Sequence, residues 1–354
     1  MHIFGYEFLR DELLPAKLVT ISSNISALKA MAGVRREAYS EEFKMLETLA
    51  KVESVKHSNA LEGIVTTDQR IQAIVGEFSS PLNHTEAEIA GYRDVLNEIH
   101  TNFAAHDFSE DEIHQFHRQM MHLADPAATG DWKTEDNVIA ERMPDGRRVV
   151  RFQPIAAKDT PEAMAQLSLA YRVARDDVGI NKLLLIPCVI LDFLCIHPFA
   201  DGNGRLSRLL TLLLLYKNGF DAGKYVSFEQ KINERKIDYY QALKESSVDW
   251  HTPAPRYFPF MINFLMTLYA CYESLDRRFA LVNAAKVPKM ARVENTVLNS
   301  LTPLSKGDIC ALLPDVSPTT VEAVLGGLVR SEKVIKLGAG RATKYARQFG
   351  QELK

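Results

Sequence analysis

Residues 197–208 read HPFADGNGRLSR and stand between two strongly apolar segments, residues 181–196 (NKLLLIPCVILDFLCI) and residues 206–216 (LSRLLTLLLLY). Both segments are long and apolar enough to form buried helices. The turn between them therefore opens the second helix, where unpaired backbone N–H groups and the helix dipole attract anions. The residues predicted to bind a phosphate group through their backbone are Gly202, Asn203 and Gly204.

The side chains around this turn are those that nucleotide chemistry uses. Arg205 and Arg208 lie three residues apart, so two permanently charged forks share one helical face and can reach one polyphosphate. Asp201 offers a hard oxygen ligand that suits Mg²⁺. His197 can accept a proton near neutral pH, and Phe199 is expected to point into the core. The expected ligand is a nucleotide polyphosphate with Mg²⁺.

The same twelve residues resemble the His-x-Phe-x-Asp/Glu-Gly-Asn-Gly-Arg-x-x-Arg signature of the Fic family of protein adenylyltransferases, without a departure. The resemblance implies transfer of AMP from ATP to a Ser, Thr or Tyr hydroxyl of a target protein or of the protein itself. It also implies that His197 deprotonates this hydroxyl, that Asp201 holds Mg²⁺, and that residues 202–205 and Arg208 bind the phosphates. A family variant with lysine in place of Gly204 transfers phosphate, so the glycine favours AMP transfer.

A second family motif precedes this stretch. Residues 41–62 have the apolar periodicity of a helix with a buried face, and Gly63 follows as its C-terminal cap. Ser58 and Glu62 lie on one face near the helix end, where the dipole disfavours a carboxylate, although an exposed glutamate is the simpler interpretation of this pattern alone. The run SNALEG resembles the Ser/Thr-x-x-x-Glu-Gly/Asn motif of the Fic inhibitory helix. This implies that Ser58, Glu62 and Gly63 are inhibitory, and that Glu62 pairs with Arg208 and blocks productive ATP binding.

Between residues 130 and 154 the sequence changes from helical to β-prone. A Pro-Asp-Gly turn at residues 144–146 separates short runs at residues 138–139 and 149–152, which predicts a hairpin. From the residues alone this is a structural flap. The resemblance implies a flap whose strand edge pairs with an extended target segment, although Lys133 stands where relatives often have arginine. The residues expected to dock the target are Asn137, Val138 and Ile139.

Other segments predict further helices. Residues 13–28 have an amphipathic pattern that Gly33 is expected to end. Tyr239 and Tyr240 resemble a tyrosine pair that borders the adenosine pocket in the family, which implies that Tyr240 forms a wall of this pocket. The remaining helices of this region are expected at residues 85–100, 110–122, 230–246 and 257–276.

The last part of the chain has the pattern helix, helix, helix, β-ribbon and resembles a winged helix-turn-helix module. Ser305 and Ser317 are expected as helix N-caps, with Pro318 in a first turn. Residues 289–354 contain ten Lys and Arg against six Asp and Glu, a net charge of +4. Binding of DNA through residues 317–331 and a wing with Arg341 is one interpretation, and a solvated or protein-docking surface is the other. The three expected helices and two strands span residues 293–301, 306–313, 317–331, 333–337 and 343–347.

Composition limits the remaining alternatives. The 354 residues are 46% hydrophobic with a net charge of −3, and the four cysteines lack C-x-x-C spacing. Pro187 and Asp192 interrupt the longest apolar run before it reaches the ~18 residues of a spanning helix, and no secretory signal is evident. We expect a cytoplasmic protein with no membrane partner. A DNA-binding transcriptional regulator that senses nucleotide, an enzyme that also removes AMP, and a homodimer remain open.

The expected architecture is therefore mainly α, a Fic-type helical core with a β-hairpin flap followed by a small winged helix-turn-helix domain. Its expected parts are an N-terminal helical region with the inhibitory helix at residues 1–84, the catalytic core at residues 85–285, and the winged-helix domain at residues 286–354.

Overall fold

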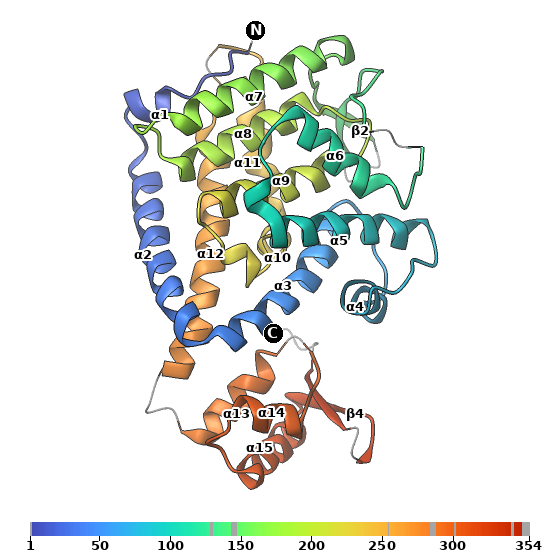
Figure 1. Cartoon of the computed structure of the whole chain (residues 1–354), viewed down its shortest axis with the longest axis vertical. Helices are drawn as coiled ribbons and strands as arrows, with labels where there is room; N and C mark the ends of the chain where they lie inside the picture. The colour runs from blue at the N-terminus through green and yellow to red at the C-terminus, as the bar shows by residue number, and fades with distance from the viewer. Residues whose placement is uncertain are drawn as a thin grey trace. The chain divides into compact units, whose positions relative to one another are not determined.

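The chain forms a mainly helical structure in two compact units (Figure 1). The computed structural model describes residues 2–127, 130–142, 147–253, 255–283, 288–300, 302–340 and 343–348. The units are Met1–Leu275 and Asp276–Lys354. The prediction of a mainly helical protein is confirmed.

The first unit consists of helices joined by short turns, with one β-hairpin. In the described chain, the helices up to the unit boundary are α1 (Phe8–Asp11), α2 (Ala16–Ala38), α3 (Ser40–Leu61), α4 (Asp68–Gly76), α5 (His84–Asn102), α6 (Glu110–Met121), α7 (Thr160–Asp176), α8 (Lys182–Ile196), α9 (Asn203–Lys217), α10 (Phe228–Glu234), α11 (Lys236–Ser247) and α12 (Phe258–Asn283). Short 3₁₀ turns are η1 (Phe103–Ala105), η2 (Ala157–Asp159) and η3 (Ala222–Lys224).

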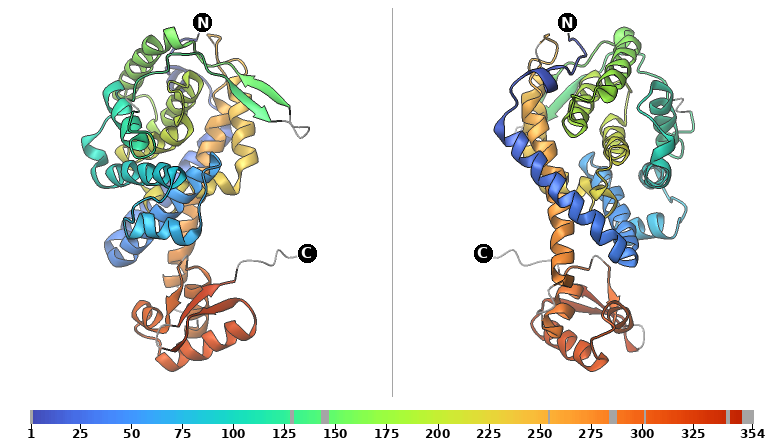
Figure 2. Two further views of the ribbon diagram at one scale, coloured as in Figure 1. Left: turned by 90° about the vertical axis from the view of Figure 1, so that its right-hand side faces the viewer. Right: turned by 60° about the vertical axis from the view of Figure 1, so that its left-hand side comes forward.

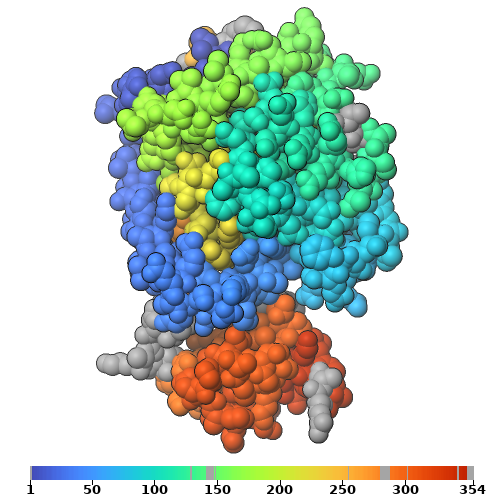
Figure 3. Space-filling model, viewed as in Figure 1, coloured from blue at the N-terminus to red at the C-terminus, as the bar shows by residue number. Residues whose placement is uncertain are grey.

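Helices α8 and α9 form the centre of this unit. Every residue of α8 after Lys182 is buried, as expected for a helix that is apolar on all sides. Helix α8 packs against α7 and α9, while α5 packs against α3, α6 and α9. Helices α5 and α6 form much of the face seen in Figure 3. The turn at residues 197–202 is therefore held between two helices that the core fixes in place.

Two helix boundaries differ from the sequence prediction. Helix α2 continues through Gly33 to Ala38. A glycine destabilises a helix by only about 1 kcal/mol, which buried contacts on the same helix outweigh. The single helix predicted over residues 230–246 is interrupted at Arg235, whose backbone is not helical (φ −126°, ψ 37°) and whose side chain bonds Asp238 in the first turn of α11.

The predicted hairpin is present. Strands β1 (Ile139–Arg142) and β2 (Arg148–Phe152) pair antiparallel, with Ile139 opposite Phe152 and a register shift after Ile139. The hairpin projects beyond the helices (Figure 2). The predicted turn at residues 144–146 lies outside the described residues.

The second unit has its own small core. Its helices are α13 (Lys289–Leu298), α14 (Lys306–Leu312) and α15 (Pro318–Arg330), and its strands are β3 (Leu304–Ser305), β4 (Val334–Leu337) and β5 (Lys344–Arg347), ordered β3-β5-β4. The buried residues at its centre include Val293, Val297, Ile309, Val321 and Leu325.

The caps predicted for this unit are confirmed. The Ser305 side chain accepts from the Asp308 N–H in a capping box, and the Ser317 side chain accepts from the Thr320 N–H. Strand β3 was not predicted, because its two residues carry too little pattern. Arg341 lies outside the described residues. The assignment as a winged helix stays a prediction.

Among the described residues, no helix combines the length and the apolar character needed to cross a membrane.

Candidate active site

A cavity of about 450 Å³ lies in the first unit, where the α8–α9 turn meets the end of α3, the hairpin and α11. The sequence-predicted residues that line it are Glu62, Ile139, His197, Asp201, Gly202, Asn203, Gly204, Arg205, Arg208 and Tyr240. Residues more than 170 positions apart in the chain thus share one cavity.

The α8–α9 turn is held in shape by its own side chains. Asn203 is buried, and its amide accepts from the Phe199 N–H at 3.0 Å and donates to the Phe199 carbonyl at 2.8 Å. Phe199 is fully buried, as predicted, and stacks on His117 with ring centroids 3.7 Å apart. Gly202 has φ +79°, a backbone angle that favours glycine, and a Cβ there would lie 2.9 Å from the end of the Met120 side chain. The Asn203 side chain therefore shapes the turn. The backbone of Asn203 forms the N-terminus of α9.

His197 ends α8 with a left-handed backbone (φ 52°). Its Nδ1–H donates to the Leu194 carbonyl at 3.3 Å, so Nε2 is the nitrogen without a proton in the neutral ring. Burial lowers the pKa of His197 to about 4. At neutral pH the ring is therefore an uncharged base that lines the cavity.

Lys133 ties the hairpin segment to this turn, a role that the sequence did not reveal. Its N–H donates to the Pro198 carbonyl at 2.8 Å, and its Nζ donates to the Ile196 carbonyl at 3.1 Å and to the Asn137 side chain at 2.8 Å. Burial lowers the pKa of Lys133 to about 8. Its positive charge also lowers the pKa of His197, after the larger effect of burial.

The three expected flap residues point in different directions. Asn137 points toward the α8–α9 turn, where its side-chain N–H groups donate to the carbonyls of His197 (3.3 Å) and Phe199 (3.1 Å). Ile139 lines the cavity. Val138 is 51% exposed. Of the three side chains, Val138 is thus the one offered to solvent.

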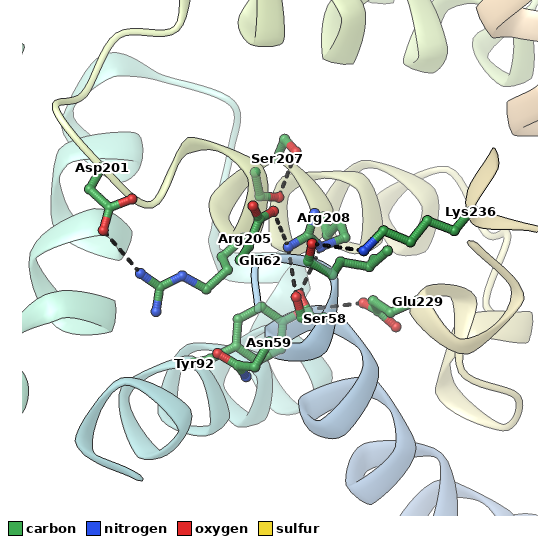
Figure 4. Close-up of polar contacts among 12 residues, drawn as sticks. Ser58, Asn59, Glu62, Tyr92, Asp201, Arg205, Ser207, Arg208, Glu229 and Lys236 are labelled. Atoms are coloured by element: carbon green, nitrogen blue, oxygen red, sulfur yellow. Dashed lines mark hydrogen bonds and ion pairs between the residues drawn. The ribbon is translucent and has the colours of Figure 1, made fainter. Parts of the chain in front are cut away.

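The two arginines of the motif diverge. The buried Arg205 reaches Glu88 on α5 with an Nη2–Oε1 distance of 3.0 Å and approaches Asp201 at 3.6 Å. Arg208 faces the end of α3 instead (Figure 4). Each fork is thus held by a carboxylate from a different part of the chain, and the expectation that both can reach one polyphosphate stays a prediction. Glu88 was not found from the sequence, since nothing local marks it.

Arg208 makes three contacts with the end of α3. Its Nε donates to the Ser58 hydroxyl at 2.8 Å, and its Nη2 donates to the Ser58 carbonyl at 2.9 Å and to Glu62 Oε1 at 2.8 Å. A Cβ on Gly204 would lie only 2.2 Å from Glu62 Oε1. The Glu62 carboxylate thus lies directly against the turn that was predicted to hold phosphate. Gly63 follows with φ +82°, the left-handed cap that was expected.

Tyr240 also borders the cavity. Its hydroxyl donates to the Leu61 carbonyl at 3.4 Å, and Lys236 Nζ donates to the same carbonyl at 3.4 Å. Asn233 on α10 does not line the cavity. Its amide instead donates to the His57 ring at 3.0 Å.

Asp201 is suited to a magnesium ion. Its side chain is 76% exposed and lines the cavity. Within the described ranges, no group of three His, Cys, Asp or Glu side chains is placed to hold a metal ion. Mg²⁺ normally takes one or two protein carboxylates and completes its shell with phosphate oxygens and water. A single exposed carboxylate beside a turn that is predicted to bind phosphate fits this coordination of Mg²⁺.

Comparison with known proteins agrees with the fold and with this site. Residues 107–215 match the model of the Fic/DOC family, a range that contains His197 and the whole α8–α9 turn. A crystal structure of a Fic family protein from Desulfovibrio desulfuricans has the same fold, with a TM-score of 0.62 at 19% identity over 96% of this chain and 98% of that chain.

Two curated relatives are named protein adenylyltransferases. The protein adenylyltransferase Fic of Nematostella vectensis is 24% identical over 205 residues, which are 56% of this chain and 44% of the relative. The protein adenylyltransferase fic-1 of Caenorhabditis elegans is 24% identical over 151 residues, 43% of this chain and 26% of the relative. This chain spans less than half the length of these relatives.

Proposed function

We propose that this chain is a protein adenylyltransferase, which transfers AMP from ATP to a Ser, Thr or Tyr hydroxyl of a target protein or of itself. The observation that carries the proposal is the meeting, in one cavity, of a histidine with an unprotonated Nε2 and a glycine-lined turn suited to phosphate. The names of the curated relatives support nucleotidyl transfer.

The proposed reaction uses the side chains of the turn in distinct roles. His197 Nε2 takes the proton of the target hydroxyl. The hydroxyl oxygen then bonds to the α-phosphorus, the bond from this phosphorus to the oxygen that bridges to the β-phosphate breaks, and pyrophosphate leaves. Arg205, Arg208 and the N–H groups of the turn hold the phosphates in line. Asp201 would hold Mg²⁺, which would supply positive charge against the phosphates.

Glu62 is proposed to inhibit this reaction. The carboxylate occupies the surface of Gly204 and neutralises Arg208, so it holds both groups that the terminal phosphates need. An incoming ATP must displace Glu62 or bind with its α-phosphate out of line. Small errors of position remove much of the benefit of orientation.

The hairpin is proposed to position the target. An extended target segment can add to an exposed strand edge through main-chain hydrogen bonds, as in other cases of β-augmentation. The projecting hairpin supports this proposal, as does the exposed Val138 directly before β1. Ile139, the first residue of β1, lines the cavity. The target hydroxyl is thereby brought before His197.

The test compares two labels of ATP. Wild-type protein and the Glu62→Gly variant are incubated with cell lysate and either α-labelled or γ-labelled ATP. AMP transfer puts the α-label, and not the γ-label, on protein, whereas phosphate transfer gives the reverse. Labelling by γ-labelled ATP alone, or no labelling in either protein, would overturn the proposal.

The pH dependence of transfer should show no inflection near pH 6.5. His197 acts as a base when unprotonated, and burial lowers its pKa to about 4, with Lys133 lowering it further and Glu62 and Asp201 opposing. Transfer by the Glu62→Gly variant should therefore be nearly constant between about pH 5.5 and 7.5. A histidine with an ordinary pKa of about 6.5 would instead lose roughly tenfold at the lower pH. Initial rates at saturating ATP decide between the two.

Removal of residues from Val287 onward should leave nucleotide affinity and self-modification within about twofold of the full chain, because no residue of the proposed mechanism lies there. We propose that residues 286–354 form a separate domain that influences target choice, so the set of labelled lysate proteins should change. Calorimetry and labelling of the truncated chain measure both effects. A truncated chain that fails to fold would contradict this boundary.

A further inference from the structure

Among the residues that the structure describes, one arginine of the cavity makes no ion pair. Arg205 is held by Glu88 and Asp201, and Arg208 is held by Glu62. Arg151 also lines the cavity, yet it makes no ion pair with any residue that the structure describes. Its Nε is buried and has no hydrogen-bond partner within that part of the chain. A buried donor without an acceptor is unfavourable, and a ligand atom can relieve this.

Arg151 lies on β2 of the hairpin, away from the phosphate-binding turn in the sequence. Strand β2 packs against α11, and Arg151 lines the same cavity as Tyr239 and Tyr240 of that helix. Burial raises the pKa of both tyrosines, and the charge of Arg151 opposes this rise. Arg151 thus enters the cavity beside the tyrosine pair.

The cavity wall that accompanies Arg151 is apolar. It includes Ile139 and Phe152, which oppose each other in the hairpin, and Leu194 and Leu243 from α8 and α11. Ligand pockets typically combine such apolar walls with a few polar groups that fix orientation. A guanidinium is planar, stacks on aromatic rings and donates hydrogen bonds at its edge. Such a fork also suits phosphate, but the apolar walls around Arg151 suit a nucleobase better than a phosphate.

We propose that Arg151 is a nucleoside-binding residue that holds the base end of the nucleotide from the hairpin side. The inference rests on the proposed function, which supplies the nucleotide. Because Glu62 does not neutralise Arg151, this contact is available to ATP even while Glu62 occupies Arg208. The hairpin then has two duties, since it binds nucleotide as well as target.

The test measures binding of two ligands by calorimetry in the presence of Mg²⁺, namely ATP and inorganic tripolyphosphate. Arg151→Met in the full-length Glu62→Gly background should weaken ATP binding by about tenfold, in line with one stacking or charge-assisted contact. Tripolyphosphate binding should stay unchanged, because it has no base. Arg151→Lys, which keeps the charge but not the plane, should show a smaller loss for ATP.

Arg172→Met is the matched control, since Arg172 is exposed on α7 and does not line the cavity. Thermal melting establishes that each variant is folded. Equal losses for ATP and tripolyphosphate would show a phosphate contact and overturn the inference, as would an unchanged affinity for ATP. A protein that transfers AMP yet binds ATP normally after Arg151→Met overturns this inference alone. A protein that binds no ATP overturns the proposed function with it.

Discussion

Replacing His197 by alanine should lower AMP transfer on the order of 10²–10⁴-fold, the usual contribution of a general base. Affinity for ATP should change by less than about threefold, because the phosphate-binding turn is held by Asn203 and Phe199 and needs no contact from the imidazole. The measurement uses α-labelled ATP with the His197→Ala change in the Glu62→Gly background, together with calorimetry. The split between rate and affinity is the informative result.

His84→Ala serves as the control for this experiment, since His84 is exposed at the start of α5. It should transfer AMP at the parental rate. If the His197→Ala protein retained near-parental transfer at saturating ATP and Mg²⁺, another group would have to be the base, and the proposed role of His197 would be wrong.

Replacing Glu62 by glycine should raise transfer, by an amount that can reach on the order of 10²-fold, since misplacement by about 1 Å can reduce a rate that much. The carboxylate lies against Gly204 and pairs with Arg208 at 2.8 Å. Its removal frees the surface of the turn and the Arg208 fork at the same time. Self-labelling and lysate labelling with α-labelled ATP measure the gain.

Glu77→Gly provides a closely matched control. Glu77 is exposed and occupies the C-cap position of α4, as Glu62 does at the end of α3. The substitution therefore changes backbone freedom at a helix end without touching the cavity. An equal gain in both variants, or no gain after Glu62→Gly in a folded protein, would reduce Glu62 to an ordinary helix-end residue.

Features of the fold that depend on local chemistry could be predicted from the sequence. The continuous apolar runs around the turn predicted α8 and α9, and Ser305 and Ser317 predicted their helix starts, because a cap acts on backbone groups within three residues. Gly33 misled the prediction for the opposite reason. The helical preference of one residue is small, and packing of the surrounding helix decided the outcome.

The parts of the site that could not be predicted are contacts between distant segments. Lys133 donates hydrogen bonds to carbonyls of the α8–α9 turn, and Glu88 pairs with Arg205. Neither contact could be predicted from the sequence, because each joins residues more than 60 positions apart. The sequence does not distinguish Arg151 from the other arginines of the same β-prone run. Its significance comes from the lack of a partner, which only the packed structure can display.

The end of α3 also determines how fast the cavity can change state. Lys236 and Tyr240 hold the Leu61 carbonyl, and Ser58 is buried against Arg208, so the helix itself is anchored. Glu62 lies just past the last helical residue, and its side chain is 36% exposed. Rotation of a partly exposed side chain takes on the order of picoseconds to nanoseconds, whereas movement of a packed helix takes microseconds or longer. If Glu62 inhibits as proposed, it would sample its alternatives many times during one encounter with ATP, and its block would act as a rapid equilibrium rather than a slow gate.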